Sequence, residues 1–239
     1  MDVVHNGVFD MHEYSGEVYR SFAECPDVSY PDETSSFRFA ADGLRLRVGA
    51  NGLACFSRAH DLLPIAASMI GGPLRVLDFG GSGGIDFKGL INSTDLDARY
   101  TIVETPAICR AGRKLWNDDR IAFCEDLPEG QFDIVYAWGA IHYVPDPIAL
   151  MKSFAAYRPK AIMILNSPFS EQAFVRVQVN RGKYRMPAWV ISMPQTCRVM
   201  AECGYRLAFK STVPGEHTVS NFAPEYRVAE DANLLFVGP

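Results

Sequence analysis

Residues 75–84 read Arg-Val-Leu-Asp-Phe-Gly-Gly-Ser-Gly-Gly. The apolar run of Val76 and Leu77 is typical of a strand buried in a parallel sheet, and it stops at an acid, Asp78. Glycines follow, and glycine allows a chain to turn tightly and to approach a ligand closely. The stretch therefore predicts a buried strand followed by a turn that holds a cofactor.

Short apolar runs alternate with helical patterns beyond residue 75, which predicts an α/β fold of βαβ units around a parallel sheet. The predicted strands are Arg75–Phe79, Tyr100–Val103, Ile121–Cys124, Phe132–Ala137, Ala161–Leu165, Tyr205–Thr212 and Asn233–Val237. The predicted helices are Pro106–Trp116, Asp146–Ala156 and Pro194–Cys203. Gly204 follows the last of these at the position favoured for a C-terminal cap.

The first 70 residues have a different pattern. Phe37–Ala40 and Leu44–Val48 flank Ala-Asp-Gly, which predicts a small hairpin. Leu53–Ile70 predicts a helix that Pro64 bends or interrupts. We interpret residues 1–70 as an N-terminal cap and residues 71–239 as the main domain.

Composition excludes several partners. The 239 residues carry a net charge of −5, which leaves no overall basic field for nucleic acid or an anionic membrane. Apolar runs such as Leu62–Ile70 are too short to span a bilayer, and the N-terminus lacks the features of a signal peptide. The six cysteines and five histidines are dispersed without ligand spacing, so we expect no metal site. We expect a cytoplasmic protein, and no stretch specifies its oligomeric state.

Two classes of cofactor use a glycine-rich turn after a first strand. A dinucleotide needs Gly-x-Gly-x-x-Gly, so that a helix N-terminus can receive the pyrophosphate. Ser82 breaks this pattern when it is read from Gly80, and Asp86 breaks it when it is read from Gly81. An acid near the helix start would also repel a phosphate, so a dinucleotide is disfavoured.

S-adenosylmethionine carries a sulfonium and an amino group but no phosphate. Asp78 offers an acid for these groups, and Gly80–Gly81 offer a close backbone approach. Glu104, which ends the next strand, could accept hydrogen bonds from two ribose hydroxyls. Asp126, or its neighbour Glu125, could accept the adenine amino group. In an open parallel sheet these strand ends line one crevice, which favours this cofactor.

The same residues resemble the class I S-adenosylmethionine-dependent methyltransferases. The family pattern V-L-D-x-G-x-G-x-G lies over Val76–Gly84, with Ser82 replacing the middle glycine, and similar segments follow in family order at Glu104, Asp126, Phe132–Val135, Ala140–Asp146 and Ala201–Tyr205. The resemblance covers roughly residues 70–239. It implies a methyltransferase domain with a Rossmann-like, doubly wound sheet of seven strands, mostly parallel with an antiparallel last strand. The cofactor residues that it implies are Asp78, Phe79, Gly80, Gly81, Glu104, Thr105, Asp126, Leu127 and Trp138.

Residues after the fourth strand are candidates for chemistry on the acceptor. A neutral His142 could take a proton from an acceptor hydroxyl or ammonium, and Tyr143 is a candidate substrate residue. The alternative is a histidine held at a helix entry, since aligned methyl transfer requires no base. Trp138 either packs in the core or lies on the adenine or the acceptor.

Residues 169–190 form a segment with two possible roles. Valines alternate with polar residues over Phe174–Val179, which is typical of a half-buried strand, and Asn-Arg-Gly at 180–182 indicates a turn. The pattern favours a solvated edge strand whose cations discourage aggregation. The alternative is a substrate lid that presents Arg176 and Arg185 to an anionic acceptor.

A narrower resemblance concerns the acceptor. Phe79–Ser82, Asn166–Phe169, Arg176–Trp189 and Tyr19–Glu24 resemble a bacterial subfamily often linked to surface-polysaccharide or secondary-metabolite gene clusters. This resemblance implies methyl transfer to an oxygen or nitrogen atom of a small polar, natural-product-like or sugar-like molecule. The alternative is a catalytically inactive methyltransferase-like domain that binds or regulates a partner.

Overall fold

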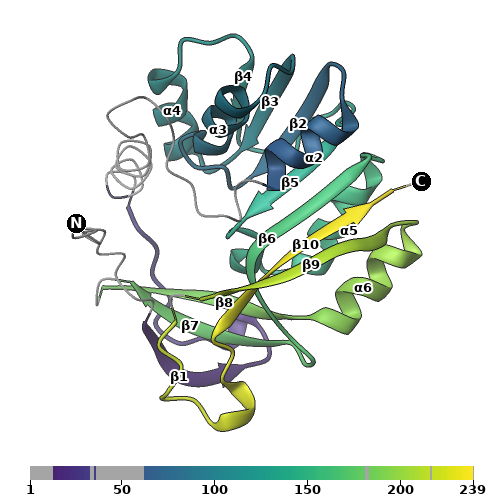
Figure 1. Cartoon of the computed structure of the whole chain (residues 1–239). Helices are drawn as coiled ribbons and strands as arrows, with labels where there is room; N and C mark the ends of the chain where they lie inside the picture. Colours follow the sequence, from purple (N-terminus) through teal and green to yellow (C-terminus); the bar gives the residue numbers. More distant parts are fainter. Residues whose placement is uncertain (1–12, 33–34, 36–61, 181–182, 216, 239) are drawn as a thin grey trace, which may run out of the picture.

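The computed structural model describes residues 13–32, 35, 62–180, 183–215 and 217–238 (Figure 1). Five parallel strands occupy the middle of its sheet in the order β4-β3-β2-β5-β6. Their bounds are Leu74–Phe79 for β2, Ala98–Val103 for β3, Ile121–Cys124 for β4, Ile134–Trp138 for β5 and Ala161–Ser170 for β6. Val76 and Leu77 of β2 are buried because helices cover both faces of the sheet, as their continuous apolar character predicts.

Two further strands complete the predicted topology. β10 (Glu230–Val237) lies antiparallel to β6 on one side and to β9 (Arg206–Pro214) on the other. The order β4-β3-β2-β5-β6-β10-β9 is a mostly parallel seven-strand arrangement with an antiparallel last strand. The predicted Rossmann-like α/β fold is therefore confirmed.

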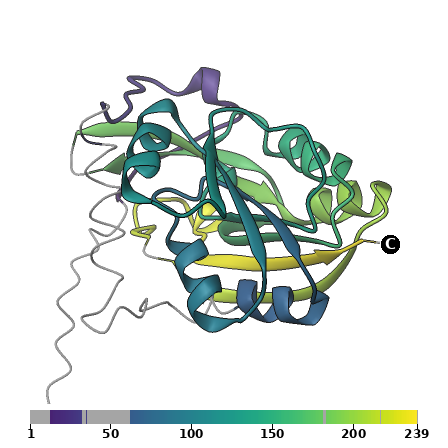
Figure 2. The ribbon, with the colours of Figure 1, turned by 90° about the horizontal axis from the view of Figure 1, so that it is seen from above.

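Helices lie on both faces of the sheet, as Figure 2 shows for α2 and α5. α2 (Leu62–Ile70), α3 (Ile85–Ser93) and α4 (Pro106–Leu115) contribute to one hydrophobic cluster, and α5 (Pro147–Ala156) and α6 (Met193–Glu202) contribute to the other. The three helices predicted after residue 100 are confirmed to within one residue at each end. Pro64 lies in the first turn of α2, where the missing N–H breaks no helical hydrogen bond.

Residues 174–192 form a hairpin of β7 (Phe174–Asn180) and β8 (Tyr184–Ser192). β8 joins the end of β6, and β1 (Glu13–Tyr19) pairs with the opposite side of β7. β7 therefore has a neighbour on both sides, and Arg176 at its centre has 0% of its surface exposed. The prediction of a solvated edge strand is wrong, because a strand about 160 residues earlier in the chain covers this edge.

The first described residues pack along this hairpin in Figure 1. After β1, a short turn η1 (Phe22–Glu24) places Phe22 on Trp189 of β8, and Ser29 pairs with Arg185 through backbone hydrogen bonds of 3.0 and 3.2 Å. The hairpin predicted within residues 37–48, and the part of the predicted helix before residue 62, lie outside the described residues.

Candidate functional site

The glycine turn after β2 needs glycine for steric reasons at two positions. Gly80 has φ +75°, and a Cβ there would overlap with the Cβ of Ala140. A Cβ on Gly81 would overlap with the Asp78 carboxylate. Ser82 adopts φ +48° without being glycine, a conformation that costs about 1 kcal/mol. The turn is therefore held close to both β2 and the segment after β5.

Asp78 is a buried acid at the end of β2, with 1% of its surface exposed. The Tyr100 hydroxyl donates a hydrogen bond of 2.8 Å to Oδ2, while Oδ1 has no hydrogen-bond partner among the described residues. Burial, and after it the charge of Asp86, raises the pKa of Asp78 well above its usual range. The unsatisfied oxygen would be stabilised by a cationic or hydrogen-bond-donating ligand.

Two more acids complete this end of the sheet. Asp86 lies buried in the first turn of α3 and accepts a hydrogen bond of 3.2 Å from the Tyr136 hydroxyl. Glu104, after β3, accepts hydrogen bonds from the backbone N–H of Ser82 at 3.2 Å and of Thr105 at 2.8 Å. Burial raises the pKa of Glu104, and these two N–H groups oppose the rise.

The three acids lie within electrostatic range of one another. The negative charges of Asp86 and Glu104 both raise the pKa of Asp78, so the carboxyl groups repel one another. Their combined field favours a cation and disfavours a phosphate at the start of α3. Each Glu104 oxygen has a second lone-pair site, so it can still accept a ribose hydroxyl.

The remaining predicted cofactor residues fall into two groups. Phe79, Leu127 and Trp138 place their side chains against the two hydrophobic clusters, and Phe79 meets Phe154 edge to face at 5.6 Å. Thr105 and Asp126 are exposed, at the start of α4 and after β4 respectively. The structure thus brings Asp78, Gly80, Gly81, Glu104 and Thr105 into one connected cluster.

His142 and Tyr143 lie in a short turn η2 (Ile141–Tyr143) after β5, directly after Ala140, which lies against Gly80. The Nδ1 atom of the buried His142 lies 3.4 Å from Oγ of Ser167, which itself donates to the carbonyl of Leu165. The rings of His142 and Tyr143 are 4.1 Å apart. The Tyr143 hydroxyl donates a 2.6 Å hydrogen bond to Oε1 of Gln178, and burial raises the pKa of Tyr143 to about 12.

The two predicted substrate arginines do not lie together. In the β7–β8 register, Val179 faces Arg185 and Ala188 faces Arg176. Because side chains alternate along a strand, Arg185 projects from the opposite face of the hairpin to Arg176 and Gln178. The structure therefore brings Arg176, but not Arg185, to the face that Tyr143 contacts through Gln178.

A buried polar triad next to Arg176 was not predicted from the sequence. The ring centre of Tyr14 lies 4.0 Å from the Arg176 guanidinium carbon. The Tyr14 hydroxyl lies 3.2 Å from Nδ1 of His217, and Nε2 of His217 lies 3.0 Å from the Asp231 carboxylate. Burial raises the pKa of Tyr14 well above its usual range, so the Tyr14 hydroxyl keeps its proton within this triad. Residues this far apart gave no local sequence signal.

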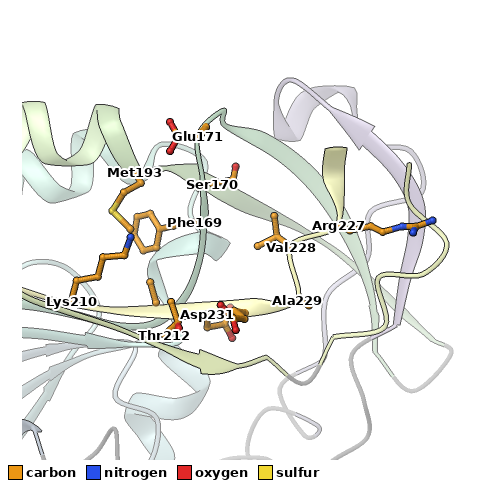
Figure 3. Close-up of a pocket in the computed structure, with 12 residues that line it drawn as sticks. Phe169, Ser170, Glu171, Met193, Lys210, Thr212, Arg227, Val228, Ala229 and Asp231 are labelled. Atoms are coloured by element: carbon orange, nitrogen blue, oxygen red, sulfur yellow. The ribbon is translucent and has the colours of Figure 1, made fainter. Parts of the chain in front are cut away.

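A surface pocket of about 580 Å³ lies on the β9–β10 side of the molecule (Figure 3). Figure 3 shows Phe169, Met193 and Lys210 at one end of the pocket and Arg227 at the other. None of its lining residues is a predicted cofactor residue. The pocket is therefore distinct from the cluster of acids and glycines at the ends of β2 and β3.

The described part of the chain holds neither a metal-binding cluster nor a membrane-spanning helix. Its His, Cys, Asp and Glu side chains form no group of three or more that could hold a metal ion. None of the helices in that part is both long and apolar enough to cross a membrane.

Comparison with known proteins gives the family. The family model described as a methyltransferase domain matches residues 47–208, which is more than half of the chain. The chain belongs to this methyltransferase family. The predicted class of enzyme and its cofactor, S-adenosylmethionine, are confirmed. No curated protein sequence matches the chain.

Solved structures share the fold of this methyltransferase at low identity. The protein complexed with the Trm112 methyltransferase activator of Haloferax volcanii is 14% identical, with a TM-score of 0.60 over 88% of this chain and 98% of that one. Magnesium protoporphyrin IX methyltransferase (ChlM) of Synechocystis PCC 6803, with bound S-adenosylhomocysteine, is 11% identical, with a TM-score of 0.54 over 89% and 90%. The [4+2]-cyclase SpnF is 14% identical, with a TM-score of 0.54 over 89% and 97%.

Proposed function

We propose that this methyltransferase transfers a methyl group to an oxygen or nitrogen atom of a small polar molecule, natural-product-like or sugar-like in character. The observation that carries the proposal is the convergence of Asp78, the Gly80–Gly81 turn and Glu104 at adjacent strand ends. The buried, unsatisfied Oδ1 of Asp78 fits a cationic cofactor.

The proposed cofactor residues contact different parts of the cofactor. S-adenosylmethionine supplies an electrophilic methyl group on a sulfonium. Asp78 offers Oδ1 to a donor and its negative charge to a cation, while the glycine turn lets the backbone approach closely. Glu104 accepts ribose hydroxyls, and the exposed Asp126 accepts the adenine amino group. These residues align the reactants, which is the main source of rate for a displacement of this type.

His142 is the proposed base. Ser167 donates its hydroxyl hydrogen to the Leu165 carbonyl, so its oxygen accepts from Nδ1 of His142. This places the proton of neutral His142 on Nδ1 and makes Nε2 the basic nitrogen. Tyr143, whose pKa is about 12, stays protonated near neutral pH and acts by positioning.

Several finer assignments belong to the same proposal. We take residues 1–70 as a cap, residues 71–239 as the methyltransferase domain and residues 169–190 as a lid over the acceptor, to which Tyr143 and Arg176 contribute. We also propose a cytoplasmic protein without nucleic-acid or membrane partners. Its proposed relatives are the bacterial enzymes from polysaccharide and secondary-metabolite gene clusters.

Calorimetry with S-adenosylhomocysteine tests the cofactor site. Glu104→Gln should weaken binding about tenfold to a hundredfold, because a charge-assisted hydrogen bond is lost. Glu129→Gln, at an exposed turn, serves as the matched control and should leave the affinity unchanged. Absence of binding by the unaltered protein at millimolar S-adenosylhomocysteine would contradict the proposal.

Turnover needs its own test, because related folds support other reactions. S-adenosylhomocysteine release should be followed with a panel of hydroxyl- and amine-bearing small molecules. Release that depends on one acceptor class, and that falls with His142→Ala, supports the proposal. Binding of the cofactor without turnover on any acceptor would instead favour the catalytically inactive domain.

A further inference from the structure

Arg176 is a buried cation that forms no ion pair with any described residue. Its Nη1 donates a 3.2 Å hydrogen bond to the carbonyl of Val228, whereas Nε and Nη2 are buried and have no hydrogen-bond partner among the described residues. A buried guanidinium with two unsatisfied nitrogens is strongly unfavourable unless a ligand satisfies it.

The positions of the unsatisfied nitrogens indicate the chemistry of that ligand. Nε–H and one Nη2–H of a guanidinium project side by side from the same edge, while Nη1 lies on the other side. This edge forms two parallel hydrogen bonds with the two oxygens of a carboxylate. Two vacant donors match a carboxylate better than a phosphate, whose third oxygen would remain unsatisfied here.

The Arg176 guanidinium is held in place by the ring of Tyr14. The Tyr14 ring lies 4.0 Å from its central carbon, which is a cation–π arrangement. The Tyr14 hydroxyl is fixed in turn by His217 and, through His217, by Asp231. The Arg176 edge is thus preorganised for a ligand.

Contacts lead from Arg176 toward the place of methyl transfer. Gln178 lies on the same face of β7 as Arg176. Its Oε1 accepts a 2.6 Å hydrogen bond from the Tyr143 hydroxyl, and the Tyr143 ring lies 4.1 Å from the His142 ring. In the sheet, β5 and β6 separate β2 and its glycine turn from the β7–β8 hairpin. Arg176 therefore lies farther from the glycine turn than His142 does. We call this region the proposed acceptor side.

We propose that the acceptor carries a carboxylate, which Nε and Nη2 of Arg176 bind at a distance from the atom that is methylated. The inference rests on the proposed function and narrows its acceptor to small carboxylic acids with a nucleophilic oxygen or nitrogen elsewhere. S-adenosylmethionine also carries a carboxylate, and the experiment below distinguishes the two sources.

An NMR titration of arginine Nε–H signals in the full-length protein tests this binding directly. The Arg176 signal is identified by its loss in Arg176→Lys. Acetate and benzoate are the probes, acetamide and benzamide are their neutral counterparts, and inorganic phosphate is the competing anion. Each is titrated with and without saturating S-adenosylhomocysteine.

We expect both carboxylates to shift the Arg176 signal and the two amides to leave it unchanged. Arg176→Lys lacks the reporter signal, so calorimetry measures its affinity; it should bind benzoate at least tenfold more weakly, because lysine keeps the charge but loses the two parallel donors. Its affinity for S-adenosylhomocysteine should stay within about twofold, which also shows that the variant is folded. Arg198→Lys, on the exposed side of α6, is the matched control and should behave as the unaltered protein.

Four outcomes would overturn the inference. A shift caused by S-adenosylhomocysteine itself, with weaker cofactor binding by Arg176→Lys, would assign the edge to the cofactor carboxylate. Tighter binding of phosphate than of benzoate would exclude a carboxylate site. No shift with any anion would leave water as the partner, and equal shifts with amides would show that charge is not recognised. Failure of S-adenosylhomocysteine to bind would refute the proposed function separately, because the carboxylate titration does not need it.

Discussion

Asp78 has two carboxylate oxygens in different surroundings. One accepts a hydrogen bond from Tyr100, while the other, which we propose binds the cofactor, has no hydrogen-bond partner among the described residues. The sequence indicated this residue because it directly follows a buried apolar run. The sequence could not indicate that Asp86 lies buried nearby, since its partner Tyr136 is 50 residues further along the chain.

We predict an unusual pH dependence of stability from Asp78. Its pKa is raised in the folded protein, so between its unfolded value of about 4 and the raised value the folded state binds more protons. The free energy of unfolding without cofactor should therefore fall as the pH rises through this window, and Asp78→Asn should flatten the slope. Urea denaturation from acidic to neutral pH measures both.

Asp95→Asn is the control for this experiment, because Asp95 is exposed before β3. Its curve should run parallel to that of the unaltered protein. Parallel curves for Asp78→Asn as well would show that the Asp78 carboxyl does not hold its proton more tightly in the folded state.

At the residue scale, Arg176 shows that an alternating sequence pattern does not predict whether the polar face of a strand is exposed. An alternation of valines with polar residues describes a strand with one wet face, whatever lies next to that strand. Here the polar face is covered by Tyr14 and by the segment that contains Val228. Both are far away in sequence, so burial of the guanidinium could not be predicted.

Among the strands and helices, β1 is short but determines the surroundings of residues far from it in the sequence. It turns β7 from an edge into an interior strand and supplies Tyr14. Its partner loop, residues 217–222, also makes a specific contact: Nδ2 of Asn221 donates a 2.7 Å hydrogen bond to the Tyr14 carbonyl. The strand had no clear signal because Gly16 and a change of register interrupt its pattern.

Tyr14→Phe should lower the free energy of unfolding by about 1–3 kcal/mol, because His217 loses a buried hydrogen bond. Tyr19→Phe is the matched control on the same strand. Its hydroxyl bonds Glu17 at the surface, so the change should stay within about 0.5 kcal/mol. Chemical denaturation measures both variants, and equal effects would contradict the proposed coupling.

A double-mutant cycle of Tyr14→Phe with Asp231→Asn extends this test. His217 bonds both residues, so their effects should not add. Additive effects would mean that the three side chains do not act as one unit.

At the scale of the whole molecule, the order of the sheet was the most predictable property. Alternating strands and helices with right-handed crossovers allow few arrangements, and the glycine turn fixed which strand lies at the centre. The crevice residues followed from that order, because parallel strands end at one edge. The insertion of β7 and β8 beside β6, and their cover by β1, depend on contacts between distant segments and could not be inferred from the local patterns.

Deletion of residues 1–20 should separate the two halves of the active site. It removes β1, whose contacts include β7 and residues 217–222, whereas the cofactor cluster lies on β2, β3 and the turn after them. We expect S-adenosylhomocysteine affinity within about threefold and a thermal midpoint lowered by about 5–10 °C, since the loss of several buried contacts costs a few kcal/mol. Calorimetry and thermal denaturation test this, and loss of cofactor affinity would contradict it.

The pairing of Tyr14 with His217 spans 203 residues, which has a consequence for the newly made chain. Translation proceeds at about 5–20 residues per second, so β1 waits roughly 10–40 s for its partner loop to be synthesised. The strands from β2 to β5 are complete by residue 138, long before that loop exists. Each molecule can therefore form the strands of the proposed cofactor site well before it forms the proposed acceptor side. Until β7 is synthesised, β1 has no strand partner, and a chaperone or a neighbouring nascent chain could reach its edges.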